Sequence, residues 1–196
     1  MILNELQIEG AAQVLALAMQ DDPLFAYLLP DQKERLSRLL PFFTAHVRFG
    51  HLFGAVYTTA GDSLGTAVWQ APGEEITPER ATVSGMNQIG KILGPDSLQR
   101  LGKTFDHLGE VHHSHLAAKH WYLMAIGVRP DFQRRGIGGA LLRPILDQAA
   151  ADRLPCYLDT SLPENLVFYR KQGFTTLVES VLPGTNLHFW TLEKRP

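Results

Sequence analysis

Apolar residues recur at helical or strand-like spacing along the first third of the chain. Residues 8–19 place apolar side chains three and four positions apart, which predicts a helix. A second helix is expected over 31–49, with Asp31 as its N-cap. The apolar runs 52–59 and 64–70 are typical of two strands joined as a hairpin.

The middle third, from 77 to about 118, has helical composition but is interrupted by glycines. These are Gly85, Gly90, Gly94, Gly102 and Gly109. Glycine lowers helix propensity by ~1 kcal/mol, so the pattern does not define where helices begin and end. Interrupted segments of this kind often shape a substrate pocket.

The clearest alternation of strands and helices comes after His120. Residues 121–128 form a continuous apolar run, as expected for a strand covered on both faces. The next segments read as helix, strand, helix and two hairpin strands, over 136–152, 156–160, 164–172, 174–182 and 187–192. This order predicts an α/β (mixed α+β) fold, with a twisted mixed sheet, a central parallel strand pair and helices on both faces. We expect one domain over 1–196, with its cofactor-binding core at 120–174.

Composition narrows the partners and the compartment. A formal net charge of −2 gives no electrostatic reason to expect nucleic acid or a membrane surface as a partner. The single cysteine, Cys156, rules out an internal disulfide and suits a reducing compartment. No apolar run approaches the ~20 residues that span a bilayer, and the N-terminus does not resemble a signal peptide. The expected location is therefore cytoplasmic.

The most informative segment is a turn between an expected strand and an expected helix, Gln133-Arg134-Arg135-Gly136-Ile137-Gly138-Gly139-Ala140. Glycines at a helix start let several backbone N–H groups face one point, where the helix dipole adds partial positive charge. With two arginines beside it, the turn favours a pyrophosphate. Gly127, in the preceding strand, indicates a bulge or a close backbone approach. Either would free backbone groups of Ile126, Gly127 and Val128 for an extended ligand arm.

A Rossmann-type dinucleotide site is the main alternative for this turn. Asp159 ends the next strand about where a ribose-binding acid would sit. Against this interpretation, Leu141 occupies the third glycine position, and the connection from Val128 to Gly136 is too long for a Rossmann turn. A P-loop is excluded because no Gly-Lys-Ser/Thr follows the glycines. The glycines could also do no more than tighten a strand–helix junction.

Two stretches together resemble the signatures of the GNAT superfamily of acetyltransferases. Residues 128–141 (VRPDFQRRGIGGAL) are similar to its acetyl-CoA-binding motif, and residues 165–174 (NLVFYRKQGF) to the helix whose tyrosine precedes Gly-Phe. The resemblance is closest to the puromycin N-acetyltransferase-like group, which 67–72, 158–169 and the final hairpin also echo. It implies a GNAT-type sheet, acetyl-CoA as donor and direct transfer of acetyl to an amine.

The same resemblance implies roles for particular residues. Tyr169 would donate a proton to the departing thiolate, and Asn165 would hydrogen-bond the pantetheine arm of the cofactor. A backbone N–H near 126–128 would stabilise the oxyanion. Core packing of Tyr169 and an ordinary first-turn position for Asn165 are the alternatives.

The general base is harder to assign from the sequence. Asp159 is the first candidate, although the puromycin-type enzymes have glutamate there and the shorter side chain would reach only through water. It could equally be a turn-forming carboxylate. His120 abuts the cofactor strand and is the second candidate. The remaining alternatives are Glu110, His112, His113 and His115.

The acceptor is the least defined part of the prediction. Trp69 matches a tryptophan of the puromycin-type group and either lines the acceptor pocket or packs in the core. Five histidines between 107 and 120 invite a metal interpretation, but their spacing does not resemble a zinc site, so no metal is expected. We expect a small-molecule amine, such as an antibiotic or a metabolite. A protein or peptide N-acetyltransferase, a non-catalytic acetyl-CoA sensor and a homodimer remain open.

Overall fold

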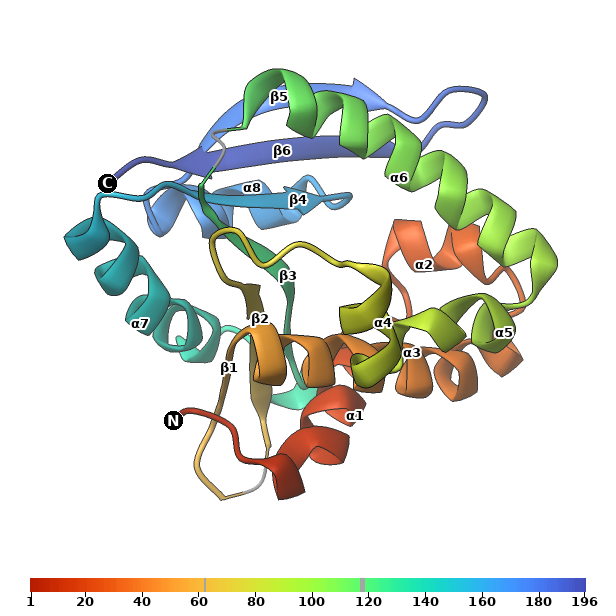
Figure 1. Cartoon of the computed structure of the whole chain (residues 1–196), viewed down its shortest axis with the longest axis horizontal. Coiled ribbons are helices and arrows are strands. Elements are labelled where there is room, and N and C mark those ends of the chain that lie inside the picture. Colours follow the sequence, from red (N-terminus) through yellow and green to blue (C-terminus); the bar gives the residue numbers. More distant parts are fainter. Residues whose placement is uncertain (62, 117–118) are drawn as a thin grey trace.

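A six-stranded sheet forms the centre of the computed structural model, which describes residues 1–61, 63–116 and 119–196 (Figure 1). The strand order is β1-β2-β3-β4-β6-β5. The strands are β1 Gly54–Thr58, β2 Gly65–Gln70, β3 Trp121–Val128, β4 Cys156–Thr160, β5 Thr175–Val181 and β6 His188–Lys194. Only β3 and β4 run parallel, and the other neighbours are antiparallel. The expected central parallel pair and mixed α/β class are confirmed.

Eight α-helices accompany the sheet in the described part of the chain: α1 Ile8–Met19, α2 Pro23–Leu28, α3 Gln32–Phe53, α4 Pro78–Ser84, α5 Ile89–Leu93, α6 Pro95–His115, α7 Ile137–Asp152 and α8 Glu164–Lys171. Asp31 caps α3 as expected, since its side chain accepts from the Lys33 amide at 2.9 Å. This helix runs past 49, however, and takes the first residues of the expected strand. No described helix is both long and apolar enough to cross a bilayer.

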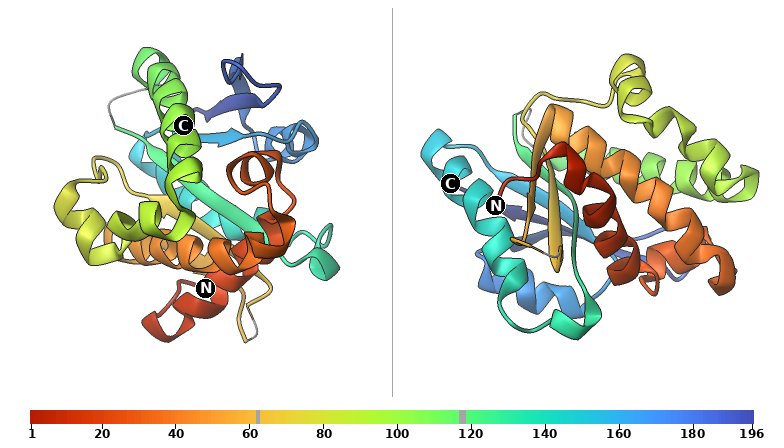
Figure 2. Two further views of the ribbon diagram at one scale, coloured as in Figure 1. Left: turned by 90° about the vertical axis from the view of Figure 1, so that its right-hand side faces the viewer. Right: turned by 90° about the horizontal axis from the view of Figure 1, so that it is seen from below.

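Helices cover both faces of the sheet, as the sequence predicted (Figures 1 and 2). Alternate strand residues belong to different hydrophobic clusters. Val68 packs with residues of α1 and α3, whereas Ala67 and Trp69 pack with residues of α7 and α8. The period of two along β2 therefore separates the two halves of the core.

The middle third of the chain is more helical than its glycines indicated. Gly94 has φ of 84° and precedes α6, with Pro95 at the first helical position. Gly102 and Gly109 lie inside α6 without ending it. Residues 117 and 118, at the end of the expected segment, lie outside the described residues.

The parallel strands pair only briefly and then separate. Trp121–Leu123 of β3 pairs with Cys156–Leu158 of β4, after which β3 continues to Val128 beside β2 alone. The β2–β3 register shifts at this point, so that Met124 has no partner on β2 and forms a bulge. An opening lined by the main chain of β3 follows from this separation.

Of the two alternatives expected for Gly127, the close backbone approach is present and the bulge is not. Gly127 keeps regular register with Thr66, and the bulge lies three positions earlier. A Cβ at Gly127 would lie 2.8 Å from the Cβ of Ala18, which is a residue of α1. The close backbone approach is therefore to the N-terminal helix, because that helix packs directly on β3.

Candidate active site

The turn between β3 and α7 has the conformation of an anion-binding corner. Arg134 and Gly136 both have left-handed φ angles, of 60° and 80°. Such residues next to right-handed ones turn successive N–H groups towards one point. Gly136 is the N-cap of α7, and no side chain caps the first turn of that helix. Arg134 and Arg135 are both exposed beside it. These features fit a diphosphate.

Two further glycines of the turn serve helix packing. A Cβ at Gly138 would lie 3.1 Å from the Phe168 ring, and one at Gly139 would lie 3.3 Å from the Gln172 side chain. Both partners belong to the α8 region. The glycines thus let α7 approach α8, which brings the two signature segments together.

A cavity of about 610 Å³ lies beyond the opening between β3 and β4. Its lining includes Ile126 of β3, Asp159 of β4, and Asn165 and Tyr169 of α8. Much of the remaining wall is contributed by α2, α3, α5 and α6. The structure therefore brings together four residues that the sequence identified separately, and the interrupted middle third does help to form the cavity.

Asp159 is the centre of a hydrogen-bonded network at one end of the cavity. Its side chain is 7% exposed. Its carboxylate accepts from the Tyr122 hydroxyl at 2.6 Å and from the Thr191 hydroxyl at 2.5 Å. Burial, and then the charge of Asp159, raise the pKa of Tyr122 well above its usual value of 10. Tyr122 therefore stays protonated and donates.

His112 is the histidine that completes this network. Its Nε2 lies 2.7 Å from Asp159 Oδ2, although the two residues come from α6 and β4. An ionised carboxylate only accepts, so Nε2 carries the proton and Nδ1 is left to accept one. His120 instead contacts the Tyr157 ring edge-on at 5.0 Å. Neither histidine is itself a lining residue, but Asp159, the partner of His112, lines the cavity. The sequence named both histidines but favoured His120.

Tyr169 is fixed among aromatic side chains. The Phe168 and Phe174 rings lie 5.1 and 5.9 Å from its ring. Burial, and then the charge of Asp22, raise its pKa far above 10. The phenol is therefore a hydrogen-bond donor at every physiological pH. Asn165, one turn earlier, donates to the Thr160 hydroxyl at 3.0 Å.

Asp22 is a second carboxylate of the cavity. It caps α2 through the Leu24 amide at 2.9 Å, and it accepts from the Ser161 hydroxyl at 2.7 Å. Burial raises its pKa, and these hydrogen bonds oppose that shift. The sequence did not indicate this role for Asp22, because its contact with Ser161 spans 139 positions.

Trp69 lies in the core. It is fully buried between the sheet and α7 and is absent from the described lining of the cavity. Its position favours the core interpretation that the sequence left open. Among the described residues, no group of three or more histidine, cysteine or acidic side chains is placed to hold a metal ion.

Buried His46, in the cavity wall, makes the free energy of unfolding depend on pH. Its Nδ1 donates to the Phe42 carbonyl at 2.8 Å, and burial lowers its pKa to about 4. An unfolded histidine titrates near ~6.5, so the unfolded chain binds more protons between these values. Stability contributed by neutral His46 is therefore present above pH ~6.5 and lost as the pH falls, by about 3 kcal/mol at pH ~4.

The measurement is urea unfolding at pH 7 and near pH 4 for the wild type and for His46→Gln. The variant should lose less stability on acidification. His115→Gln is the matched control, because His115 makes the same Nδ1 contact with a carbonyl, at 2.9 Å, but is exposed. Equal acid sensitivity in all three proteins would contradict the assignment.

Comparisons with known proteins agree with this geometry. Residues 98–176, which include both signature segments, match the acetyltransferase (GNAT) domain family. Over 90 residues, 46% of the chain, it is 34% identical to the N-alpha-acetyltransferase RimI of Mycobacterium tuberculosis, of which the match covers 49%. Over 191 residues, 88% of the chain, it is 23% identical to a probable serine/threonine-protein kinase of Dictyostelium discoideum, of which the match covers 20%. The chain thus spans about half, or less, of the length of these relatives.

The fold is shared with a solved acetyltransferase. The crystal structure of histone acetyltransferase HPA2 and related acetyltransferase from Corynebacterium glutamicum has a TM-score of 0.70 at 18% identity, covering 100% of this chain and 94% of that one. Residues 98–176 are therefore similar to a GNAT acetyltransferase domain. The likeness to the solved acetyltransferase concerns the fold.

Proposed function

We propose that the protein transfers the acetyl group of acetyl-CoA to the amine of a small-molecule acceptor. The observation that carries this proposal is that β3, which leads into the anion-binding corner, lines the same cavity as Tyr169 and Asp159. Acetyl-CoA is the donor used generally in the family. The left-handed Arg134 and Gly136 and the uncapped start of α7 fit its diphosphate.

The main chain of β3 would hold the rest of the donor. Beyond Leu123, its polar groups on the β4 side have no strand partner. Backbone N–H groups there can hydrogen-bond the pantetheine arm and the oxyanion that develops on the thioester carbonyl. Asn165, at the start of α8, supports the same arm.

Proton removal from the acceptor is assigned to the His112–Asp159 pair. An amine of pKa ~10.4 is charged at pH 7, and neutralising it costs roughly 4.6 kcal/mol. Nδ1 of His112 can accept this proton, because Asp159 orients the ring and stabilises the imidazolium that results. The neutral nitrogen then attacks the carbonyl carbon, a C–N bond forms and the C–S bond breaks. We assign no step to His120.

Tyr169 donates to the departing sulfur. Its raised pKa makes complete proton transfer to a thiolate, with a pKa near ~8.5, unfavourable at the outset. Tyr169 therefore stabilises the leaving thiolate by a hydrogen bond, and the second proton of the attacking nitrogen ends on the thiol. The ammonium thus loses two protons: the one taken by His112 is released to solvent, and the other reaches the sulfur. The products are the amide, free CoA and one proton.

A protein or peptide amine is the second candidate acceptor. The likeness to RimI, whose name is that of an N-alpha-acetyltransferase, favours it. The closer resemblance to the puromycin N-acetyltransferase-like group, carried by 67–72 and 158–169, supports the small-molecule proposal instead. Thiol release with peptides and with small amines separates the two acceptor classes.

The proposed donor site is tested by Gly136→Ala. A side chain in left-handed conformation costs roughly 1–2 kcal/mol, and the added Cβ enters the space where the phosphates would approach. Calorimetry should show CoA binding weakened by about tenfold or more. Gly184→Ala is the matched control: Gly184 also has a left-handed φ, of 78°, with open space beside it, but lies in the β5–β6 turn. Absence of CoA binding by the wild type would overturn the proposed function.

A further inference from the structure

The helical part of the cavity wall is apolar. Phe25, Phe42 and Phe43 meet edge to face, with ring centres 5.2 to 5.6 Å apart. Further apolar side chains of α2, α5 and α6 continue this wall, namely Leu24, Leu28, Ile89, Leu101 and Leu108. A ligand here must bury an apolar surface, because few polar partners are available to it.

The charged groups of the cavity are all of one sign. Among the described lining residues, the carboxylates are Asp22 and Asp159, and there is no lysine or arginine. His46, the remaining base of the lining, is buried and has a pKa lowered to about 4, so it is neutral. The cavity therefore complements a cation and disfavours an anion.

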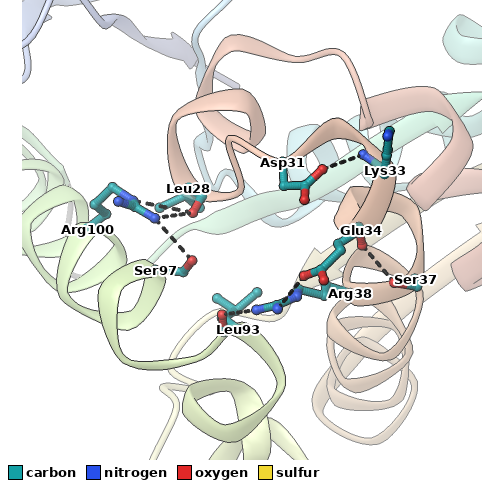
Figure 3. A network of polar contacts seen from close by, with 9 residues as sticks. All are labelled: Leu28, Asp31, Lys33, Glu34, Ser37, Arg38, Leu93, Ser97 and Arg100. Carbon is teal, nitrogen blue, oxygen red and sulfur yellow. Dashed lines mark hydrogen bonds and ion pairs between the residues drawn. The ribbon is translucent and has the colours of Figure 1, made fainter.

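Arginines of the surrounding helices are directed away from the cavity. Arg100 of α6 donates to the Leu28 carbonyl at 3.1 Å, and Arg38 of α3 donates to the Leu93 carbonyl at 2.7 Å (Figure 3). Neither arginine lines the cavity. They join α6 to α2 and α3 to α5, and their guanidinium groups are thus engaged in fastening the wall.

The rim of the cavity is apolar as well. Ile76, Leu98 and Phe105 belong to its lining, and they are 48%, 46% and 57% exposed. Exposed apolar side chains that gather at one opening are typical of ligand-binding grooves. The rim therefore extends the apolar surface from the interior to solvent.

We infer that the acceptor is a primary monoamine with an extended aromatic or alkyl body and no anionic group. Its amine would lie at the Asp159 end and its body among α2, α3, α5 and α6. This inference rests on the proposed function, which supplies the amine. The volume, about 610 Å³, is within the range of cavities that enclose a drug-sized molecule.

The inference excludes several common amines as good acceptors. A free amino acid would place a carboxylate near Asp159 and Asp22 without a cation to neutralise it. A diamine would carry its second ammonium into the apolar wall. Both penalties act on binding as well as on turnover, so they can be measured without catalysis.

The test compares amines that differ in one charged group. 2-Phenylethylamine is compared with phenylalanine, tryptamine with tryptophan, and decylamine with 1,10-diaminodecane. Acetyl transfer is followed by thiol release, and binding by calorimetry in the presence of CoA. The expected kcat/KM and affinity are at least about tenfold higher for each apolar monoamine. Equal or better binding of the charged partners would overturn the inference.

Binding and turnover, measured together, distinguish a failure of this inference from a failure of the proposed function. Preferential binding of the monoamines without acetyl transfer would overturn the proposed function and leave only the class of ligand that the cavity binds. Acetyl transfer confined to amino acids, diamines or peptides would overturn the inference and keep an acetyltransferase. Much tighter binding of decanoyl-CoA than of acetyl-CoA would show that the cavity houses an acyl chain, which also overturns it.

A variant pair locates the effect in the cavity. Phe105→Ala should raise KM for tryptamine by about fivefold or more and leave CoA affinity unchanged, because Phe105 lines the rim. Leu52→Ala is the control, since Leu52 is also an exposed apolar residue but does not line the cavity. Neither side chain is buried, so both variants should fold. Equal KM values in the two variants would contradict the placement of the apolar body.

Discussion

Tyr169→Phe is expected to lower kcat by about 10²- to 10⁴-fold and to leave CoA affinity nearly unchanged. The phenol of Tyr169 is buried, and its pKa is raised by burial and by the charge of Asp22. It can therefore act only as a donor, and its contribution grows as charge develops on the sulfur. Removing the hydroxyl keeps the ring contacts with Phe168 and Phe174.

The measurement combines steady-state thiol release with calorimetry of CoA binding. Tyr157→Phe is the matched control, because Tyr157 is buried on β4 and its hydroxyl donates to Glu193 at 2.7 Å, away from the cavity. That variant should lose stability and keep its turnover number. Unchanged turnover of Tyr169→Phe would remove this residue from the mechanism.

Asp159→Asn is expected to lower kcat/KM by about 10²- to 10³-fold at pH 7 for an acceptor amine of high pKa. The amide keeps the size of the side chain but loses the charge that stabilises an imidazolium at His112. Its NH2 group would also face the Tyr122 hydroxyl, which now donates to the carboxylate. The expected decrease in kcat/KM therefore comes from slower proton removal from the acceptor.

The pKa of the acceptor provides the discriminating readout. For an α-amino amide, whose amine titrates near ~7.7–8.0, roughly one molecule in ten is already neutral at pH 7, so the loss should be far smaller. His112→Gln should follow the same trend, and His120→Gln should not. Asp147→Asn is the control, because Asp147 is an exposed partner of Arg143. A loss that is the same for amines of both kinds would make Asp159 structural.

The sequence defined those features that local pattern encodes. The run 121–128 and the strand 156–160 predicted a parallel pair because a helix of crossover length separates them, and the pair is present. The glycine-rich turn could also be predicted from the sequence, because the glycines and arginines that would bind a diphosphate are consecutive residues. Gly102 and Gly109 were misleading because tertiary packing holds α6 together across them.

Contacts across long sequence distances were beyond reach of the sequence alone. His112 meets Asp159 across 47 positions, and Ser161 meets Asp22 across 139. Periodicity predicts that a helix has an apolar face, but not which neighbour that face meets. For this reason the sequence favours His120, which lies next to the cofactor strand along the chain, over His112, which contacts Asp159 in the folded protein.

The separation of β3 from β4 at the Met124 bulge divides the molecule into parts that can change independently. The donor's arm would be held by main-chain groups, which every residue type provides. Most point substitutions along β3 would therefore keep these hydrogen bonds. Much of the wall that we assign to the acceptor consists of side chains from helices that precede β3. Repeated substitution in those helices can therefore redirect such a protein to new amines, in nature or in the laboratory, without rebuilding how it holds the thioester.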